Sequence, residues 1–215
     1  MRIKSIVAPA LILACLCSTA SAGDWTPLNR EQALEQTRSH DLDKRRLAYG
    51  RLAEIGTMED IPLLLAALWD EHELIRGIAE QSVWGIWLRT DDPVADPLFQ
   101  TGIQLINEDK PDDAIAKLNQ VIELKPDFAE AWNRRGNAYA ARGDEARALA
   151  DYEHTLKLNP YQFGAMESCG EIWMLRSNYR KAADYFRRAL EINPNLAEAV
   201  DALRSLEAKL ENDRI

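Results

Sequence analysis

The sequence predicts an all-α protein, a right-handed α-solenoid made of helix-turn-helix repeats. Two observations predict this fold class. The segment 95–196 repeats with a period of 34, three times without a gap, and the segment before it repeats more faintly at a spacing of 31. Within each unit, apolar residues recur three or four positions apart, which is the spacing of one face of an α-helix. One helical hairpin cannot bury its own apolar face, so neighbouring units must stack.

The segment 1–22 has the composition of a secretory signal peptide. Arg2 and Lys4 begin it, positions 6–16 are apolar, and small residues end it at Ala22. Such a run is shorter than the roughly 20 apolar residues that a membrane span needs. We expect cleavage after Ala22 and a periplasmic or secreted protein, without a membrane span.

A lipid anchor at Cys15 is the alternative interpretation of the same segment. Ala14 suits a lipoprotein signal, but the bulky Leu13 does not. Cleavage after Ala22 would leave Cys169 as the remaining cysteine, so no intramolecular disulfide is expected. The core must then stabilise the fold.

The charge of the chain excludes two classes of partner. The whole sequence carries a net charge of −9, and without Arg2 and Lys4 it has 24 basic and 35 acidic side chains, a net charge of −11. This charge argues against nucleic acid and against anionic membrane surfaces.

Small residues recur at fixed positions in the three units of residues 95–196. They let the two helices of a hairpin approach closely, and the prolines end each unit because proline cannot extend the helix before it. These positions are Gly102, Gly136 and Gly170; Ala114, Ala148 and Ala182; and Pro126, Pro160 and Pro194. Large apolar residues fill further registers: Leu98, Trp132 and Met166; Leu105, Tyr139 and Trp173; Leu118, Tyr152 and Phe186; and Ile122, Leu156 and Leu190.

The middle unit carries the strongest resemblance to a known family. Its residues 129–132 read AEAW, residues 135–139 read RGNAY, and Gly143-Asp144 and Asn159-Pro160 follow. This pattern resembles the tetratricopeptide repeat (TPR) family. The resemblance implies three units, at residues 95–128, 129–162 and 163–196. Residues 197–215 follow them, with an amphipathic capping helix over residues 197–210.

Residues 23–94 form the fainter array. Arg45, Ala48, Leu52 and Ile55 recur at a spacing of 31 as Arg76, Ala79, Val83 and Ile86. Between them, residues 60–68 read DIPLLLAAL, a helix with an early proline. The set resembles HEAT-like helical repeats. A leading helix is expected over residues 29–39, with Asn29 as its N-cap, and Gly56 is expected to cap another helix. The polar segment 89–93 is the expected boundary, where the two arrays stack into one body.

The TPR resemblance also implies a peptide-binding groove lined by the first helix of each repeat. Its lining residues would be Phe99, Ile103 and Ile106; Asn133, Asn137 and Ala140; and Glu167, Glu171 and Met174. Exposed amides four positions apart can bond the backbone of an extended peptide. Some family members instead bind a terminal carboxylate with several basic residues. Here Arg134 alone is basic, and Glu167 would repel such a ligand.

Signals for chemistry are scarce. The segment Asp70-Glu71-His72-Glu73 is an acidic cluster with a histidine, but no further ligand falls at metal-site spacing, and acidic residues that begin a helix favour its dipole. Cys169 falls on an inward face and is expected to pack as a small hydrophobe. Trp84 and Trp87 are expected in the core, with an exposed aromatic edge as the alternative. No catalytic residue, metal site or cofactor is predicted.

The sequence therefore predicts an exported, non-catalytic adaptor or scaffold of a bacterial-type cell envelope, which holds a protein or peptide partner in the groove. The alternative is a structural subunit of an envelope assembly that uses its convex face and caps.

Overall fold

The computed structural model describes residues 26–212, and the predicted signal peptide and Cys15 lie outside them. All the regular elements in the described range are helical, which confirms the all-α fold class. The first part comprises α1 (Arg30–Gln36), α2 (Leu42–Ile55), the 3-10 helix η1 (Met58–Asp60), α3 (Ile61–Ala67) and α4 (Glu73–Trp87). The second comprises α5 (Ala95–Asn107), α6 (Pro111–Leu124), α7 (Ala129–Ala141), α8 (Glu145–Leu158), α9 (Phe163–Leu175), α10 (Tyr179–Ile192) and α11 (Ala197–Asn212).

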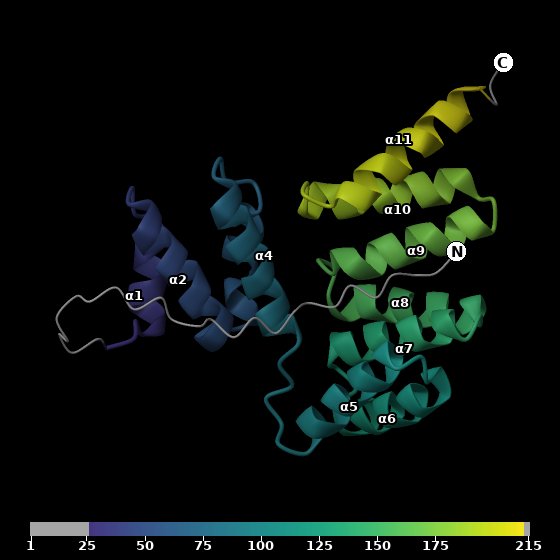
Figure 1. The fold of residues 1–215 in the computed structure, drawn as a ribbon, viewed down its shortest axis with the longest axis horizontal. Helices are drawn as coiled ribbons and strands as arrows, with labels where there is room; N and C mark the ends of the chain where they lie inside the picture. Colours follow the sequence, from purple (N-terminus) through teal and green to yellow (C-terminus); the bar gives the residue numbers. More distant parts are fainter. Residues whose placement is uncertain (1–25, 213–215) are drawn as a thin grey trace.

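Helices α5 to α10 form three stacked hairpins, called the repeat array below. Each first helix packs on its own second helix, and in the first two hairpins the second helix also packs on the first helix of the next hairpin. Figure 1 shows the resulting stack, with α11 covering α10 at its end. One face of α11 is buried through Ala199 and Leu206, while Glu198, Asp201 and Arg204 are exposed, as expected of a capping helix.

The recurring glycines mark where the two helices of each hairpin touch. A methyl group on Gly102 would lie 2.9 Å from the Leu118 side chain, and one on Gly136 would lie 2.6 Å from the Tyr152 ring. The third unit repeats the arrangement, because a methyl group on Gly170 would lie 2.9 Å from the Phe186 ring. Contacts under 3.0 Å would force the side chain or the helix to move. The repeating pattern of small and large residues is therefore a pattern of helix contacts.

The turn inside each hairpin requires one residue in the left-handed region. Gly143 has φ +82°, and it ends α7 at the predicted place. Asp109 and Ser177, at the equivalent positions of the first and third units, adopt the same conformation with φ 57° each. The backbone geometry therefore repeats although the residue type does not.

Helices α1 to α4 form the N-terminal array. Asn29 and Gln32 build the expected capping box of α1, and Gly56 is the C-cap of α2. Helix α4 packs on α2, and the Ser82 hydroxyl donates to the Tyr49 carbonyl oxygen at 2.8 Å. The residues that recur at a spacing of 31 thus belong to two helices in contact.

One hydrophobic core joins the N-terminal array to the repeat array. Trp84 and Trp87 of α4 contact the ring of Phe163 at the start of α9, with ring centroids 5.4 and 5.3 Å away. Met166 and Ala189 belong to the same buried cluster. Figure 1 shows α4 between α2 and the ends of the repeat helices. Trp87 is therefore a buried core residue, and the partly buried Trp84 packs against the same core at the interface between the arrays.

Polar contacts join the two arrays at Asn195 and order the segment between them. The Asn195 amide, between α10 and α11, donates to the Leu68 carbonyl oxygen at 2.8 Å and accepts from Arg76 Nε at 2.9 Å. In the connecting segment, the Asp92 carboxylate accepts from the Val94 and Ala95 amides at 2.8 Å each. The connection is thus structured, which agrees with the expectation of one stacked body.

Candidate functional site

The residues predicted to line the groove occupy α5, α7 and α9, and they differ in exposure. Below, the groove face means these nine positions. Glu171 is exposed. Phe99 and Asn133 are buried, and the others are partly buried: Ile103, Ile106, Asn137, Ala140, Glu167 and Met174. The part of the face open to a partner therefore lies on α9 and on the second halves of α5 and α7.

The exposure expected of Phe99 and Asn133 is wrong. Phe99 has no exposed surface and packs edge-on against Phe128, with ring centroids 5.0 Å apart. Asn133 is 3% exposed, and its amide nitrogen donates to Glu130 Oε1 at 3.1 Å. Both positions are covered by contacts that the repeat pattern does not specify.

Asn137 is also not the free amide that the sequence suggested. The buried Tyr152 hydroxyl donates to Asn137 Oδ1 at 2.8 Å. Tyr152 approaches α7 through the space left by Gly136, so this contact crosses from the second helix of the hairpin to the groove face. Asn137 therefore contributes to folding, and its Nδ2 group remains for a partner.

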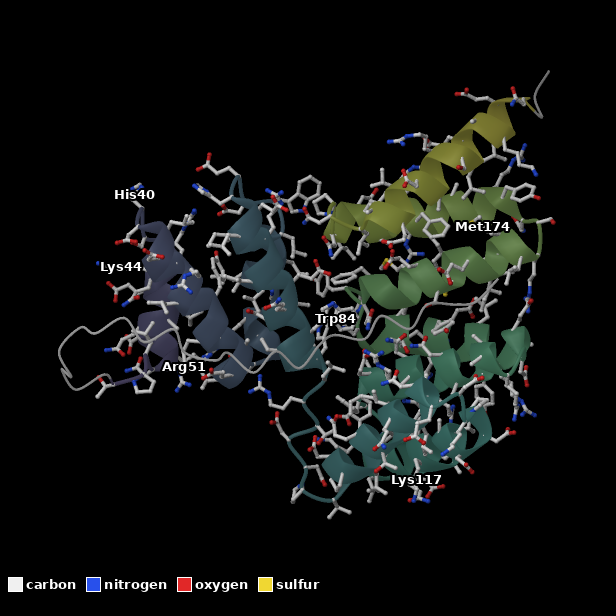
Figure 2. All side chains as sticks on the ribbon, in the orientation of Figure 1. His40, Lys44, Arg51, Trp84, Lys117 and Met174 are labelled. Atoms are coloured by element: carbon white, nitrogen blue, oxygen red, sulfur yellow. The ribbon has the colours of Figure 1, made fainter. Side chains whose placement is uncertain are left out.

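A buried polar cluster occupies the end of the groove face nearest to the N-terminal array. The Glu130 carboxylate lies 2.8 Å from Arg134 Nε and accepts from Gln162 Nε2 at 2.7 Å. The guanidinium of Arg134 lies over the Trp84 ring, 5.9 Å from its centroid. Figure 2 shows Trp84 pointing from α4 toward the ends of the repeat helices. Arg134, the one basic groove candidate, is therefore engaged within the protein.

Glu167 sits among other glutamates. Burial raises the pKa of its carboxyl to about 8, and the charges of Glu171, Glu198 and Glu80 act in the same direction. Burial also raises the pKa of Glu171, whose side chain remains in contact with solvent. These four carboxyl groups come from α4, α9 and α11. At neutral pH Glu167 is therefore mostly protonated, so its carboxyl can donate a hydrogen bond as well as accept one.

The other candidates for chemistry are engaged in structural contacts. Burial raises the pKa of the Cys169 thiol to about 12, and the side chain has no exposed surface. Asp70 pairs with Arg45 at 2.9 Å, and His72 Nδ1 lies 3.1 Å from the same guanidinium. Among residues 26–212, no group of three His, Cys, Asp or Glu side chains is arranged to hold a metal ion. In that same range, no helix has the length and apolar character of a membrane span.

A cavity of about 350 Å³ lies between the two arrays. Its lining includes Met58 and Trp87 on one side and Phe128 and Leu158 on the other. None of the nine groove positions lines it.

Comparison with known proteins identifies the repeats. The family model described as tetratricopeptide repeat matches residues 100–163 and 146–197. Residues 100–197 are tetratricopeptide repeats. The TPR array thus corresponds to helices α5 to α10, as the sequence pattern indicated.

Two relatives are similar to part of the chain. A TPR repeat-containing protein of Rhizobium etli is 30% identical over 128 residues, which is 60% of this chain and 63% of that protein. The Hsp70-Hsp90 organizing protein 1 of Glycine max is 26% identical over 114 residues, 53% of this chain and 20% of that protein. The chain thus spans less than two thirds of the length of either relative.

Solved structures show the same architecture. The first TPR domain of Spaghetti (RPAP3), bound to the HSP90 peptide SRMEEVD, is 25% identical, with a TM-score of 0.52 over 54% of this chain and 93% of that chain. The Sgt2 TPR domain from Aspergillus fumigatus, 21% identical, gives a TM-score of 0.53 over 57% of this chain and 83% of that chain. The second likeness shows the fold alone.

Sequence reasoning missed the residues that bring the N-terminal array to the groove face. Phe163 stands where the sister repeats have Ala95 and Ala129, and Gly164 follows it. A methyl group on Gly164 would lie 3.2 Å from the Trp84 ring, so this glycine leaves room for the tryptophan. A large aromatic at a small-residue position was the available signal.

Proposed function

We propose that this protein is a non-catalytic adaptor that holds a protein or peptide partner on the groove face of its TPR array. One observation supports the proposal above the others. Polar groups on that face, the Asn137 Nδ2 group and the carboxylates of Glu167 and Glu171, have no hydrogen-bonding partner in residues 26–212. The protein provides no internal ligand for them, while the same fold in the RPAP3 domain carries a bound peptide.

The partner differs in chemistry from the acidic peptide of that neighbouring structure. The sequence SRMEEVD carries two glutamates and an aspartate. Here Arg134 is paired with Glu130 and stacked on Trp84, so it is not available to a carboxylate. The charge of Glu171 would repel an acidic segment, because unpaired like charges facing each other across an interface cost several kcal/mol, on the order of 2–5.

Capture of binding partners from the native cell tests whether the partner binds the groove face or the outer surface of the repeats. The bait is the protein from residue 23 onward, used to bind partners from its own envelope fraction. The groove variant is Glu171→Ala with Met174→Ala. The matched control is Glu123→Ala with Leu124→Ala, which removes one glutamate and one large apolar side chain from the exposed surface of α6. We expect the groove variant to lose the partner and the control to retain it.

The reverse outcome would favour the structural-subunit alternative. A partner lost by the α6 variant and retained by the groove variant would show that binding uses the second helices of the repeats. The groove proposal would then be withdrawn.

Export is a separate part of the proposal. We propose that the segment ending at Ala22 directs the chain to the periplasm or the cell exterior and is then removed. Intact-mass measurement of the native protein should give a chain that begins at Gly23. A diacylated chain that begins at Cys15 would replace this proposal with a lipoprotein.

A further inference from the structure

We propose that the cavity between the two arrays is a second binding site, which takes a small molecule with an apolar body, a hydrogen-bond acceptor and no negative charge. The proposal goes beyond the groove face, because none of the nine groove positions lines this cavity. It does not rest on the proposed function, so either of the two can fail alone.

The size and position of the cavity suit a small molecule. Its volume of about 350 Å³ is the share of about twelve water molecules, at roughly 30 Å³ each. A molecule of on the order of ten non-hydrogen atoms would therefore fill it. Sites for small molecules occur preferentially where two domains meet, and this cavity has walls from both arrays.

The apolar walls of the cavity are incompletely covered. Met58 of η1 and Leu158 of α8 both line it, and they remain 53% and 37% exposed. Phe128, at the start of α7, packs edge-on against Phe99 with ring centroids 5.0 Å apart, so this wall is held in place. An apolar guest between these side chains would remove them from water, which is favourable.

The indole of Trp87 is the second and independent argument. Trp87 lines the cavity and is 3% exposed, but its Nε1–H group has no acceptor among residues 26–212. The ring packs against Trp84 and Phe163, each with its centroid 5.3 Å away, and neither of those side chains contains an acceptor. A buried donor without an acceptor is costly, and the cavity is an unfilled space that this indole borders. An oxygen atom of a guest in the cavity would accept the hydrogen bond.

The charged groups around the cavity disfavour an anion. Arg89 is the basic residue of the lining, and its Nη groups donate to three carbonyl oxygens at the end of α2, at 2.7, 3.3 and 3.1 Å. The carboxylate of Glu130 is paired with Arg134. Asp91 and Asp127 are exposed and make no hydrogen bond or ion pair with another of the described residues. Two unpaired carboxylates outweigh one guanidinium, so a neutral or cationic molecule is favoured.

Such a ligand would link the two arrays. Its contacts would come from η1 and α4 on one side and from the start of α7 and the end of α8 on the other. A ligand that binds only the docked arrangement stabilises that arrangement by mass action. The site would therefore make the junction between the arrays sensitive to the concentration of the ligand.

Two matched probes test the site by NMR on the chain from residue 23 onward. The first is 3-phenylpropanamide, which is neutral and has a carbonyl acceptor. The second is 3-phenylpropionate, which has the same number of non-hydrogen atoms and a negative charge. The signal observed is the indole N–H of Trp87, assigned with the Trp87→Phe variant. We expect the amide to shift this signal with a dissociation constant of about 1 mM, and the propionate to bind at least about fivefold more weakly.

Matched variants separate the cavity from general apolar adsorption. The site variant, Met58→Ala with Leu158→Ala, removes two exposed apolar walls. The control, Leu47→Ala with Leu175→Ala, removes two similarly exposed apolar side chains outside the lining. We expect the site variant to weaken binding of the amide by about tenfold and the control to change it less than about twofold.

The Trp87→Phe variant tests the acceptor. It retains an aromatic ring and removes the N–H donor, and urea unfolding checks that it folds. Binding of the amide is then followed through the backbone N–H signal of Met58. We expect binding to weaken by about two- to tenfold, because one hydrogen bond is lost.

Each other outcome overturns the proposal. A Trp87 signal that moves with neither probe at about 5 mM refutes the small-molecule site. Equal binding of the two probes contradicts the selection against an anion, and unchanged binding by Trp87→Phe contradicts the acceptor. Equal weakening in the site variant and the control would mean non-specific adsorption. If neither probe binds but a captured partner shifts the Trp87 signal, the cavity holds a side chain of that partner instead.

Discussion

The partly buried carboxyl of Glu167 should make the protein less stable as the pH rises from 5 to 8. Its pKa is about 8 in the folded protein, against an ordinary value of 4.5. The folded protein holds this proton more tightly than the unfolded chain does. The stability that the proton contributes is therefore fully present below the pKa of the unfolded chain, and it is lost as the pH rises through the pKa of the folded protein. The loss proceeds at no more than about 1.4 kcal/mol per pH unit for one group.

The interval from pH 5 to 8 isolates this effect from the other perturbed carboxyls. The pKa values of Asp60, Asp92, Asp144 and Glu108 are lowered, by the guanidinium of Arg30 or by hydrogen bonds that stabilise the carboxylate. Groups of that kind add stability that is lost only toward acid, below about pH 5. Among the perturbed carboxyls, the fall in the free energy of unfolding between pH 5 and 8 therefore comes from Glu167. The solvent-exposed Glu171 adds a smaller contribution of the same sign.

Urea unfolding at several pH values measures the effect. Glu167 retains some contact with solvent, so we expect the free energy of unfolding to fall by about 1–3 kcal/mol between pH 5 and 8, less than the limiting slope allows. Glu167→Gln should remove most of that fall and raise stability at pH 8. The control Glu191→Gln, on the exposed face of α10, should retain it. A parent protein whose stability is constant or rises over this interval would refute the reasoning, as would a Glu167→Gln variant that falls as steeply as the parent.

Four further predictions concern packing and backbone geometry. Gly136→Ala should lower the free energy of unfolding by about 1–3 kcal/mol, because the added methyl group meets an aromatic ring at 2.6 Å. In the same denaturant melts, Gly77→Ala should raise the free energy of unfolding by about 0.5–1 kcal/mol, because this position of α4 has open space around it. The parent should unfold in one calorimetric transition, and Trp84→Ala should cost about 3 kcal/mol and separate the two arrays into two transitions. Ser177→Gly should raise the thermal midpoint, since a left-handed residue other than glycine costs about 1–2 kcal/mol, and an unchanged or lower midpoint would contradict the assigned turn. In the chain from residue 23 onward, Cys169 should react with a thiol reagent only after denaturant is added.

The period of 34 predicted the repeat array well because the contacts behind it are local. Gly136 and Tyr152 lie on consecutive helices of one hairpin, and the same pairing of a glycine with a large side chain recurs in both sister units. Such a contact places a small and a large residue at a fixed spacing in every repeat, so the periodicity of the sequence predicts it. The helix caps at Asn29 and Gly56 could be predicted equally well from the sequence, because each cap depends on residues within one turn of the helix.

The groove face was predicted less well because its surroundings are not periodic. Asn133 was expected to be exposed, but it is buried beside the Glu130 cluster, which adjoins the N-terminal array through Arg134 and Trp84. That array packs against α9 through α4, and the two helices lie far apart in the sequence and share no repeat. Asn137 was expected to be free of folding contacts, but the Tyr152 hydroxyl reaches it across the hairpin. A tyrosine in place of phenylalanine adds one oxygen, and the sequence does not show where that oxygen points.

Two departures from the repeat pattern occur at neighbouring positions and have one structural consequence. Phe163 introduces a large ring where the sister repeats have alanine, and Gly164 removes a side chain beside it. Together they accept Trp84, and this contact sets α4 against the repeat array. The same docking brings Glu80 of α4 near Glu167. Because the two arrays share one hydrophobic core, we expect them to unfold together and to separate only when that core is weakened.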